Sequence, residues 1–347
     1  MIRTLTIFAL LLLIMESCEK NLPTEREDKK IFALAVHGGA GNIKKLNLTE
    51  TEEEQFKTVI DSALQAGYLI LEKGGSAKDA VVAAITILED SPLFNAGRGA
   101  VFNHDGINEL DASIMEGKNL EAGAVASLRH IKNPIQLALV VLNDSKYIFL
   151  SSDGAEKYAQ SNGIELIDPK YFFTDHRWNQ LQEARKNNEM KLDHSEPSNS
   201  SSLLNKLSGE DKFGTVGCVA LDQDGNVVAG TSTGGLTNKD FGRIGDSPII
   251  GAGTYANNKT CAVSCTGRGE DFIRLSVAHE ISAQMMHGKK NLKSAVEDVI
   301  QNQLKSIDGR GGCIAIDKSG NIIMSFTTTG MYRGWMRSNG SKEISIY

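Results

Sequence analysis

The sequence predicts one α+β domain, a four-layer αββα sandwich in which two stacked β-sheets lie between two layers of helices. Three observations support this prediction. Strand-like apolar segments occur both before and after a polar stretch that ends near residue 213. Segments with helical spacing accompany the strands on both sides of that stretch. The patterns CVALDQDGN (residues 218–226) and CIAIDKSGN (residues 313–321) repeat one strand–turn–strand motif.

The composition is that of a soluble globular protein. The 347 residues are 41% apolar and 23% charged, which allows a sizeable core. A formal net charge of −6 argues against nucleic acid or an anionic membrane surface as the main partner. The 34 glycines and only 6 prolines indicate tight turns and close backbone approaches.

The N-terminus is predicted to be separate from the fold. Residues 1–17 combine Arg3 with an apolar run that is too short to span a bilayer, which is typical of a signal peptide. Cys18 stands where a bacterial lipoprotein is acylated, although Glu16 replaces the usual small residue. A charged tether follows at 18–30. We therefore expect an exported protein, periplasmic or membrane-anchored through acylated Cys18; a plain signal peptide and an uncleaved anchor are the alternatives.

In the first half, periodicity and turn residues place the elements. Apolar residues recur at helical spacing from residue 51 to 73, Gly74 and Gly75 end that helix, and Ser76 is a candidate N-cap for the next one. The expected elements are a strand at 31–41 ending in a glycine-rich turn, helices at 51–73 and 77–90, a loop at 91–103, strands at 108–117 and 121–128, a helix at 133–144, a strand at 146–152 and a short helix at 153–163.

The second half begins after a polar, Ser/Asn-rich stretch at about 169–212, which we interpret as a linker or surface excursion. The repeated motifs at 218–226 and 313–321 predict hairpins with Asp and Gly-Asn in their turns. Their strands are apolar on both faces, as in a sheet covered on both sides. Between the hairpins we expect one helix at 269–288 and a second at about 292–304.

Common catalytic motifs are absent from the sequence. It has no P-loop, no GxSxG elbow and no HExxH, and the HGGAG segment lacks the spacing of a dinucleotide fingerprint. The cysteines after Cys18 have no metal-ligand spacing, and we expect them to be small buried hydrophobes. They are Cys218, Cys261, Cys265 and Cys313.

Thr215 is the notable residue, because a well-formed strand begins abruptly beside it. A threonine hydroxyl is a weak nucleophile, but a threonine at a chain N-terminus has a base in its own α-amino group. That amine has a reference pKa of roughly 7.7–8, so part of it is neutral near pH 7. Thr215 obtains such an amine only if the bond after Gly214 is cut, and Gly214 has no side chain to shield that bond.

The stretch from 215 to 258 resembles the plant-type asparaginases/isoaspartyl peptidases, which are N-terminal nucleophile (Ntn) hydrolases. Further matches are AVHGGAG, LFNAGRGAVF, ELDASIMEG, AGAVASL, IKNP, CTGRGEDFIR and GMYRGW, so the resemblance covers nearly everything from 31 to 335. It implies an αββα sandwich that cuts itself before a threonine and then hydrolyses asparagine and β-aspartyl dipeptides, with no cofactor for catalysis. The chain would divide into an α subunit, 31–214, with a mobile linker at about 185–214, and a β subunit, 215–347.

The same resemblance implies a role for individual residues. Thr215 would be the nucleophile, Gly214–Thr215 the autocleavage bond and Thr233 the residue that orients the nucleophile. A zwitterionic amino-acid head group would be held by Arg243 and Asp246, which would bind its carboxylate and its ammonium. Thr266 and Gly267 would stabilise the oxyanion, and Asn95 would lie near the nucleophile. The remaining substrate-binding candidates are Ile244, Gly245, Arg268 and Gly269.

Maturation, metal and assembly are also implied only by the resemblance. A glycine-rich loop at His37, Gly38 and Gly39 would influence autocleavage, and two αβ units would form an (αβ)₂ dimer. Loop carbonyls would hold a structural sodium ion. The residues concerned are Leu88, Glu89, Ser91, Phe94, Ala96 and Arg98.

Other functions remain open on the sequence. Glycosylasparaginase is the main alternative, although that family usually has Asn where Gly235 stands. A taspase-type protease and a non-enzymatic amino-acid-binding lipoprotein are further alternatives. Alone, Arg243 and Asp246 would more often be a surface pair of little energetic weight. Arg98 and Arg268 depart from the family pattern and are candidates for biasing substrate choice.

Overall fold

The structure is a computed structural model that describes residues 30–43, 48–144, 146–186 and 214–347. The chain divides into a unit Met1–Lys30 and a unit Ile31–Tyr347, and the helices and strands given below belong to the second. The predicted signal peptide, Cys18 and nearly all of the tether lie outside the described residues, as does most of the predicted linker. Within the described ranges, no helix is long and apolar enough to cross a membrane.

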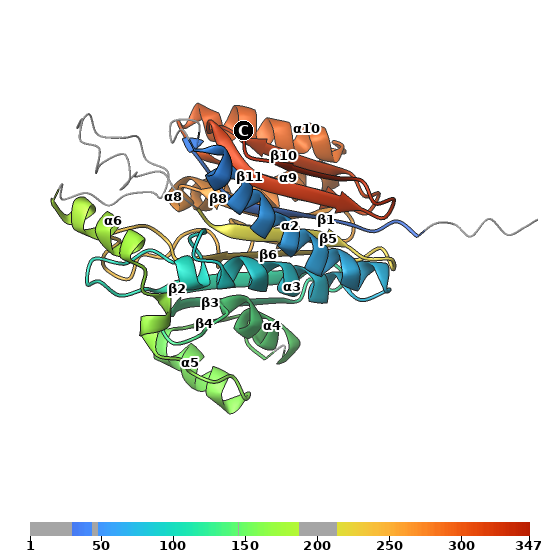
Figure 1. Cartoon of the computed structure of the whole chain (residues 1–347). Helices are drawn as coiled ribbons and strands as arrows, with labels where there is room; N and C mark the ends of the chain where they lie inside the picture. Colours follow the sequence, from blue (N-terminus) through green and yellow to red (C-terminus); the bar gives the residue numbers. More distant parts are fainter. Residues whose placement is uncertain (1–29, 44–47, 145, 187–213) are drawn as a thin grey trace, which may run out of the picture. The chain divides into compact units, whose positions relative to one another are not determined.

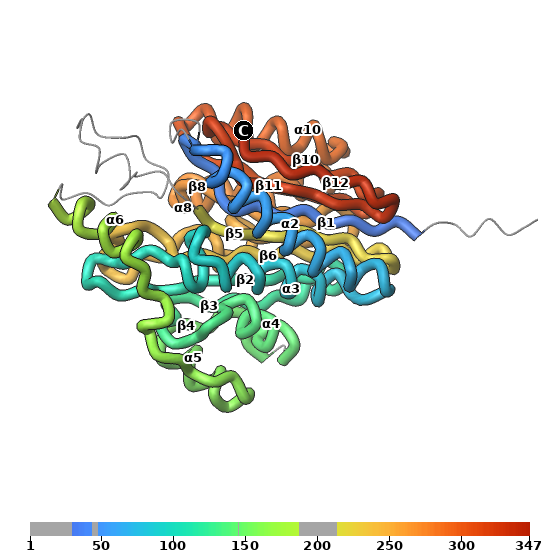
Figure 2. Tube along the Cα trace, viewed as in Figure 1, coloured from blue at the N-terminus to red at the C-terminus, as the bar shows by residue number. Residues whose placement is uncertain are grey.

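The larger sheet joins distant parts of the chain. Its strands are β1 (Ala33–Gly41), β2 (Leu110–Glu116), β3 (Ala122–Leu128), β4 (Phe149–Ser151), β5 (Val216–Leu221), β6 (Val227–Thr233), β11 (Gly330–Arg337) and β12 (Lys342–Ser345). Their spatial order is β12-β11-β1-β5-β6-β2-β3-β4, and neighbours are antiparallel except for β3 and β4. Figure 2 shows β1, β5 and β11 side by side at its centre.

The smaller sheet comes entirely from the second half of the chain. Its strands are β7 (Thr254–Ala256), β8 (Cys261–Gly267), β9 (Gly311–Asp317) and β10 (Ile322–Phe326), in the antiparallel order β10-β9-β8-β7. The two copies of the repeated motif are therefore confirmed as hairpins, β5–β6 in the larger sheet and β9–β10 in the smaller one.

Helices cover the outer face of each sheet (Figure 1). The larger sheet packs against α2 (Glu50–Glu72), α3 (Ala77–Asp90) and α4 (Pro134–Asp144). The smaller sheet packs against α8 (Gly269–Leu275), α9 (Val277–Met286), α10 (Leu292–Glu297) and the π-helical turn η4 (Asp298–Leu304). A third apolar cluster fills the space between the sheets. The predicted αββα sandwich is confirmed.

Strand β5 shows why its sequence is apolar at every position. Val216, Cys218 and Ala220 belong to the core beneath α2–α4. Val219 and Leu221 point the other way, into the core between the sheets. Successive strand residues point to opposite faces, so a strand covered on both sides has no solvent face on which to place polar residues.

Local hydrogen bonds account for the element ends that the sequence predicted. The Ser76 hydroxyl accepts from the Asp79 N–H at 3.1 Å, which caps α3. In the β5–β6 turn the Asp222 carboxylate accepts from two backbone N–H groups, those of residues 224 and 226. Asp317 does the same in the β9–β10 turn. The shared aspartate therefore closes both hairpins.

Three expectations need correction. The glycine-rich segment His37–Gly41 is part of strand β1, with a register shift between His37 and Ala40, because β11 continues to pair with it. The helix expected at 269–288 is broken at Ser276, whose φ of 49° is left-handed. The polar stretch after residue 169 contains the 3₁₀ turn η3 (Pro169–Phe172) and helix α6 (Asp175–Lys186). Helix α5 (Ser152–Ser161) precedes them as expected.

We expect Gly123→Ala to destabilise the fold, because a Cβ on this β3 glycine would lie 2.0 Å from the Ala138 carbonyl oxygen of α4. The helix would have to move away from the sheet, at a cost of about 2 kcal/mol or more in unfolding free energy. Gly154→Ala is the matched control, since Gly154 lies exposed in α5 with no atom near its Cβ position. Chemical denaturation of both variants tests this, and equal stabilities would contradict it.

Candidate active site

The nucleophile candidate lies at the start of β5. Thr215 is buried, and its Oγ1 donates a hydrogen bond to Thr233 Oγ1 at 3.0 Å. The β5–β6 register, in which Val216 faces Ser232, brings the two threonines together. Thr233 Oγ1 also accepts from the Gly235 N–H at 3.1 Å. The predicted role of Thr233 in orienting Thr215 therefore has a direct geometric basis.

Asn95 supports the loop after β6. Its Nδ2 donates to the Gly235 carbonyl at 2.8 Å, and its Oδ1 accepts from the Val101 N–H at 3.0 Å. Its own carbonyl accepts from the Gly234 N–H. Asn95 thus holds the backbone that contacts Thr233, and it also lines the pocket.

Thr266 and Gly267 end strand β8 and line the same pocket as Thr215. The Thr266 hydroxyl is buried, and within the described residues it has no hydrogen-bond partner. A side chain at Gly267 would collide with the Arg310 carbonyl, because its Cβ would lie 2.3 Å from that oxygen. A buried donor without a partner is costly to a fold and is expected where a ligand supplies the acceptor.

Arg243 is already paired. Its Nε and Nη2 donate to the two carboxylate oxygens of Glu270, each at 3.0 Å. Partial burial of Glu270 opposes ionisation, but the hydrogen bonds and charge of Arg243 hold its pKa below the usual value. Nη1 lies on the Gly245 side, where a Cβ would be 2.9 Å away. One edge of the guanidinium is therefore occupied by Glu270.

The carboxyl group of Asp246 is buried. In the parts of the chain that the structure describes, its Oδ2 has no hydrogen-bond partner. Burial raises its pKa to about 7, the charge of Arg243 opposes this rise, and Glu270 and Asp111 add to it. A cationic group bound here would stabilise the carboxylate form.

One pocket brings these groups together. Its lining residues are Asn95, Gly214, Thr215, Thr233, Gly235, Leu236, Arg243, Gly245, Asp246, Ser247, Thr266 and Gly267. Of the predicted substrate-binding residues, Ile244, Arg268 and Gly269 do not line it, and the Arg268 side chain is exposed. Gly269 packs against the backbone of the pocket residue Asp246, since a Cβ at position 269 would lie 2.8 Å from the Asp246 N.

The glycine-rich segment of β1 contacts the predicted cleavage bond. His37 Nδ1 hydrogen-bonds the Thr215 carbonyl at 3.0 Å. Gly39 has a φ of +107°, and a Cβ there would lie 2.5 Å from the N and Cα atoms of Gly214. Gly38 packs against the Phe94 ring with equally little room. Gly39 is required because its backbone approaches residue 214 closely, and Gly38 is required because the Phe94 ring occupies the space of a side chain.

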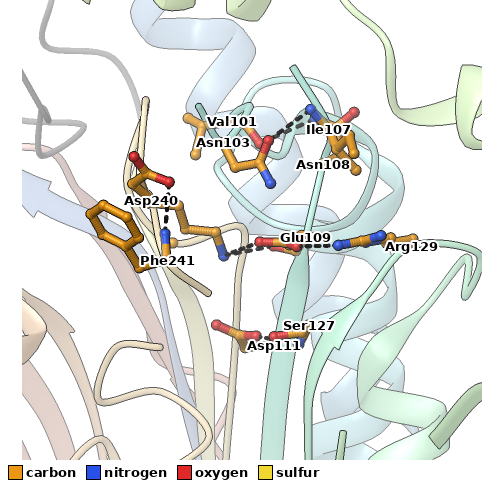
Figure 3. A network of polar contacts seen from close by, with 12 residues as sticks. Val101, Asn103, Ile107, Asn108, Glu109, Asp111, Ser127, Arg129, Asp240 and Phe241 are labelled. Carbon is orange, nitrogen blue, oxygen red and sulfur yellow. Dashed lines mark hydrogen bonds and ion pairs between the residues drawn. The ribbon is translucent and has the colours of Figure 1, made fainter. Parts of the chain in front are cut away.

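A network of charged and polar contacts around Glu109 was missed by the sequence analysis (Figure 3). Lys239 is almost fully buried, and its Nζ lies 3.7 Å from Glu109 Oε2. Arg129 binds the other oxygen of Glu109 at 2.8 Å. Lys239 also packs beside Gly235, where a Cβ would lie 3.1 Å from Nζ. Glu270 was missed as well, although its place directly after the Gly267–Gly269 segment was a usable signal.

The loop predicted to hold sodium is closely packed around its glycines. A Cβ at Gly99 would lie 2.0 Å from the Phe94 carbonyl oxygen and 2.8 Å from that of Pro92, and one at Gly97 would lie 2.4 Å from that of Glu89. Carbonyl oxygens are the ligands that hard cations prefer. Among the described residues, no group of three His, Cys, Asp or Glu side chains could hold a metal ion.

Stability should depend on the ionisation of Asp246. Its folded pKa, about 7, lies above the ordinary value of 3.8, so the folded state retains a proton that the unfolded state has lost between these pH values. Stability contributed by this group is therefore lost as pH rises toward 7. We expect Asp246→Asn to raise the melting temperature relative to the wild type increasingly with pH over this range. Asp240→Asn, on the same loop, is the control; a difference that does not change with pH would refute this assignment.

Comparison with known proteins agrees with the geometry. The asparaginase family model matches residues 30–346. The chain is 45% identical to the isoaspartyl peptidase of Escherichia coli K12, over 90% of this chain and 95% of that protein. It is 43% identical to a putative isoaspartyl peptidase/L-asparaginase of Dictyostelium discoideum, over 92% and 99%. It is 40% identical to the probable isoaspartyl peptidase/L-asparaginase 2 of Arabidopsis thaliana, over 91% and 99%. The chain therefore belongs to the plant-type asparaginase/isoaspartyl peptidase family of Ntn hydrolases.

Proposed function

We propose that this protein is an autoprocessing threonine amidohydrolase that hydrolyses β-aspartyl dipeptides and L-asparagine and releases L-aspartate. One observation carries the proposal: one pocket holds the Thr215–Thr233 pair, the head-group residues Arg243 and Asp246, and the Thr266 hydroxyl, which has no hydrogen-bond partner among the described residues. The names of the relatives, isoaspartyl peptidase and L-asparaginase, support the same substrates.

Cleavage between Gly214 and Thr215 releases the α-amine of Thr215, which then serves as its base. Thr215 Oγ1 passes its proton to this amine and attacks the side-chain carbonyl carbon of the substrate. The oxyanion receives hydrogen bonds from the Thr266 hydroxyl and the Gly267 N–H, each worth about 3–4 kcal/mol to the transition state. The leaving nitrogen takes the proton, and water then hydrolyses the aspartyl ester, with the amine again acting as base.

Substrate recognition uses opposite charges in a confined space. The α-carboxylate binds the Nη1 side of Arg243, which Glu270 orients by holding Nε and Nη2. The α-ammonium binds Asp246 and supplies the partner that its Oδ2 lacks within the described residues. An aspartyl group bound at both points directs its side-chain amide toward Thr215.

Several parts of the proposal rest on the sequence and on the family resemblance. These are the division into subunits 31–214 and 215–347, the (αβ)₂ dimer, and export through residues 1–17 with acylation of Cys18. A structural sodium ion would be held by carbonyl oxygens of the loop 88–98, such as those of Glu89 and Phe94, which lie beside Gly97 and Gly99.

Autocleavage gives the most direct test. We expect the purified protein to migrate as two fragments on a denaturing gel, with N-terminal sequencing placing the start of the smaller one at Thr215. Thr215→Ala should remain a single chain and lose hydrolysis, because it lacks the hydroxyl group. Thr260→Val removes a buried hydroxyl group on the other side of the smaller sheet and should still cleave. Hydrolysis by Thr215→Ala would place the nucleophile elsewhere.

A substrate panel separates the alternatives. Asparagine, β-aspartyl dipeptides and glycosylated asparagine are assayed with the same preparation. Release of aspartate from the first two supports the proposal. Turnover confined to glycosylated asparagine would support glycosylasparaginase, and binding of asparagine without turnover would support a binding protein.

We expect Arg243→Ala to raise KM for β-aspartyl dipeptides by about 100-fold while autocleavage continues, because only substrate binding uses the guanidinium. Glu270→Gln keeps the shape but weakens the hold on Arg243, and we expect a smaller rise of about tenfold. Steady-state kinetics on fully cleaved protein measure both effects. An unchanged KM in Arg243→Ala would exclude the head-group role.

A further inference from the structure

A row of polar side chains crosses the space between the two sheets, which is otherwise filled by apolar residues. Its members are fully buried: His37, Ser113, Thr231, Thr254 and Ser264. Each comes from a different strand (β1, β2, β6, β7 and β8). The residues on either side of Ser113 and of Ser264 belong to the cores beneath the helices, so these two side chains point toward the other sheet. Buried polar groups in such a layer persist only when they are hydrogen-bonded.

Continuous hydrogen bonds connect this row to the nucleophile residue. His37 Nδ1 lies 3.0 Å from the Thr215 carbonyl oxygen, and His37 Nε2 lies 3.0 Å from Ser264 Oγ. Ser264 Oγ lies 2.7 Å from Thr231 Oγ1, which lies 2.6 Å from Thr254 Oγ1. Ser113 Oγ completes the row, and its single proton is shared between Thr254 Oγ1 at 2.8 Å and the Ser247 carbonyl at 2.6 Å.

The direction of these bonds follows from their ends. The Thr215 carbonyl can only accept, so His37 Nδ1 must donate and Nε2 must be unprotonated. Nε2 then accepts from Ser264, which leaves the Ser264 oxygen to accept from Thr231. Thr254 donates to Thr231 in turn. Burial lowers the pKa of His37 to about 3, which agrees with a neutral ring.

The Thr215 carbonyl needs this support because the sheet does not provide it. Pairing between β1 and β5 ends with His37 opposite Gly217, and β1 bulges directly after His37. Once the chain is cut, Thr215 also loses its covalent neighbour on the N-terminal side. The hydrogen bond from the His37 ring then takes the place of the missing strand-to-strand hydrogen bond at Thr215, whose hydroxyl group must be oriented.

We infer that the row His37–Ser264–Thr231–Thr254–Ser113 is a positioning relay that fixes the orientation of Thr215 and ties it to the substrate-binding loop at Ser247. Ser247 follows Asp246 and itself lines the pocket. The relay residues act through Thr215 and do not contact substrate. This inference rests on the proposed function, because it assigns the relay to the same nucleophile.

The test compares Thr231→Val, which keeps the shape and removes the hydroxyl group, with Thr231→Ser, which restores that group. We expect Thr231→Val to lower kcat for a β-aspartyl dipeptide, or the rate of autocleavage, by about tenfold, with KM within about twofold. Thr231→Ser should recover most of the loss. Thr260→Val is the matched control, since the Thr260 hydroxyl group is buried and bonded to Ser282 at 2.6 Å. It should lose similar thermal stability and keep both rates.

Equal rates in Thr231→Val and Thr260→Val would overturn the relay, as would a Thr231→Ser variant as slow as Thr231→Val. The direction of the relay is tested separately by ¹⁵N–¹H NMR of the wild-type His37 ring. We expect a proton on Nδ1, none on Nε2 and no titration near neutral pH; a proton on Nε2 would overturn the assignment. This second measurement does not depend on activity. A wild-type protein that hydrolyses nothing would count against the proposed function, and the NMR result would still decide the relay.

Discussion

The close approach of the two sheets beside Gly217 controls the position of Thr215. A Cβ at Gly217 would lie 2.0 Å from Ser264 Oγ and 2.4 Å from His37 Nε2. Only glycine therefore lets a side chain of the larger sheet meet one of the smaller sheet at this point. The hydrogen bond that reaches the Thr215 carbonyl depends on that meeting, and Thr215 in turn defines the pocket.

The site also contains buried polar groups whose hydrogen bonds are not completed by the described residues. The Thr266 hydroxyl and Asp246 Oδ2 are buried and have no hydrogen-bond partner among the residues that the structure describes. Such groups reduce stability, and a protein retains them where a ligand completes their bonding. Both lie in the pocket that also contains Thr215 and Arg243. In the proposed reaction, the Thr266 hydroxyl would bind the oxyanion and Asp246 Oδ2 would bind the substrate ammonium group. Hydrolysis of the side-chain amide of an aspartyl group requires both interactions.

The parts of the fold that the sequence predicted are those controlled by local interactions. Helix α3 begins where Ser76 caps it, and the hairpins close where Asp222 and Asp317 bind the turn backbone. The errors fall where distant segments override local signals. The glycines after His37 suggested a turn, but pairing with β11 keeps them in β1. Ser276 gave no sign of the break between α8 and α9.

By itself, the sequence determined the αββα class, the threonine at the start of β5 and the family to which the motifs belong. These follow from periodicity, turn residues and motif order, all of which are read along the chain. Only the tertiary structure decided that Glu270 holds one edge of Arg243, that Lys239 is buried beside Gly235, and that His37 supports Thr215 from another strand. The contacts of Arg243 with Glu270 and of His37 with Thr215 join residues that are far apart in sequence. They depend on sheet register and on the spacing between layers, which no local pattern specifies.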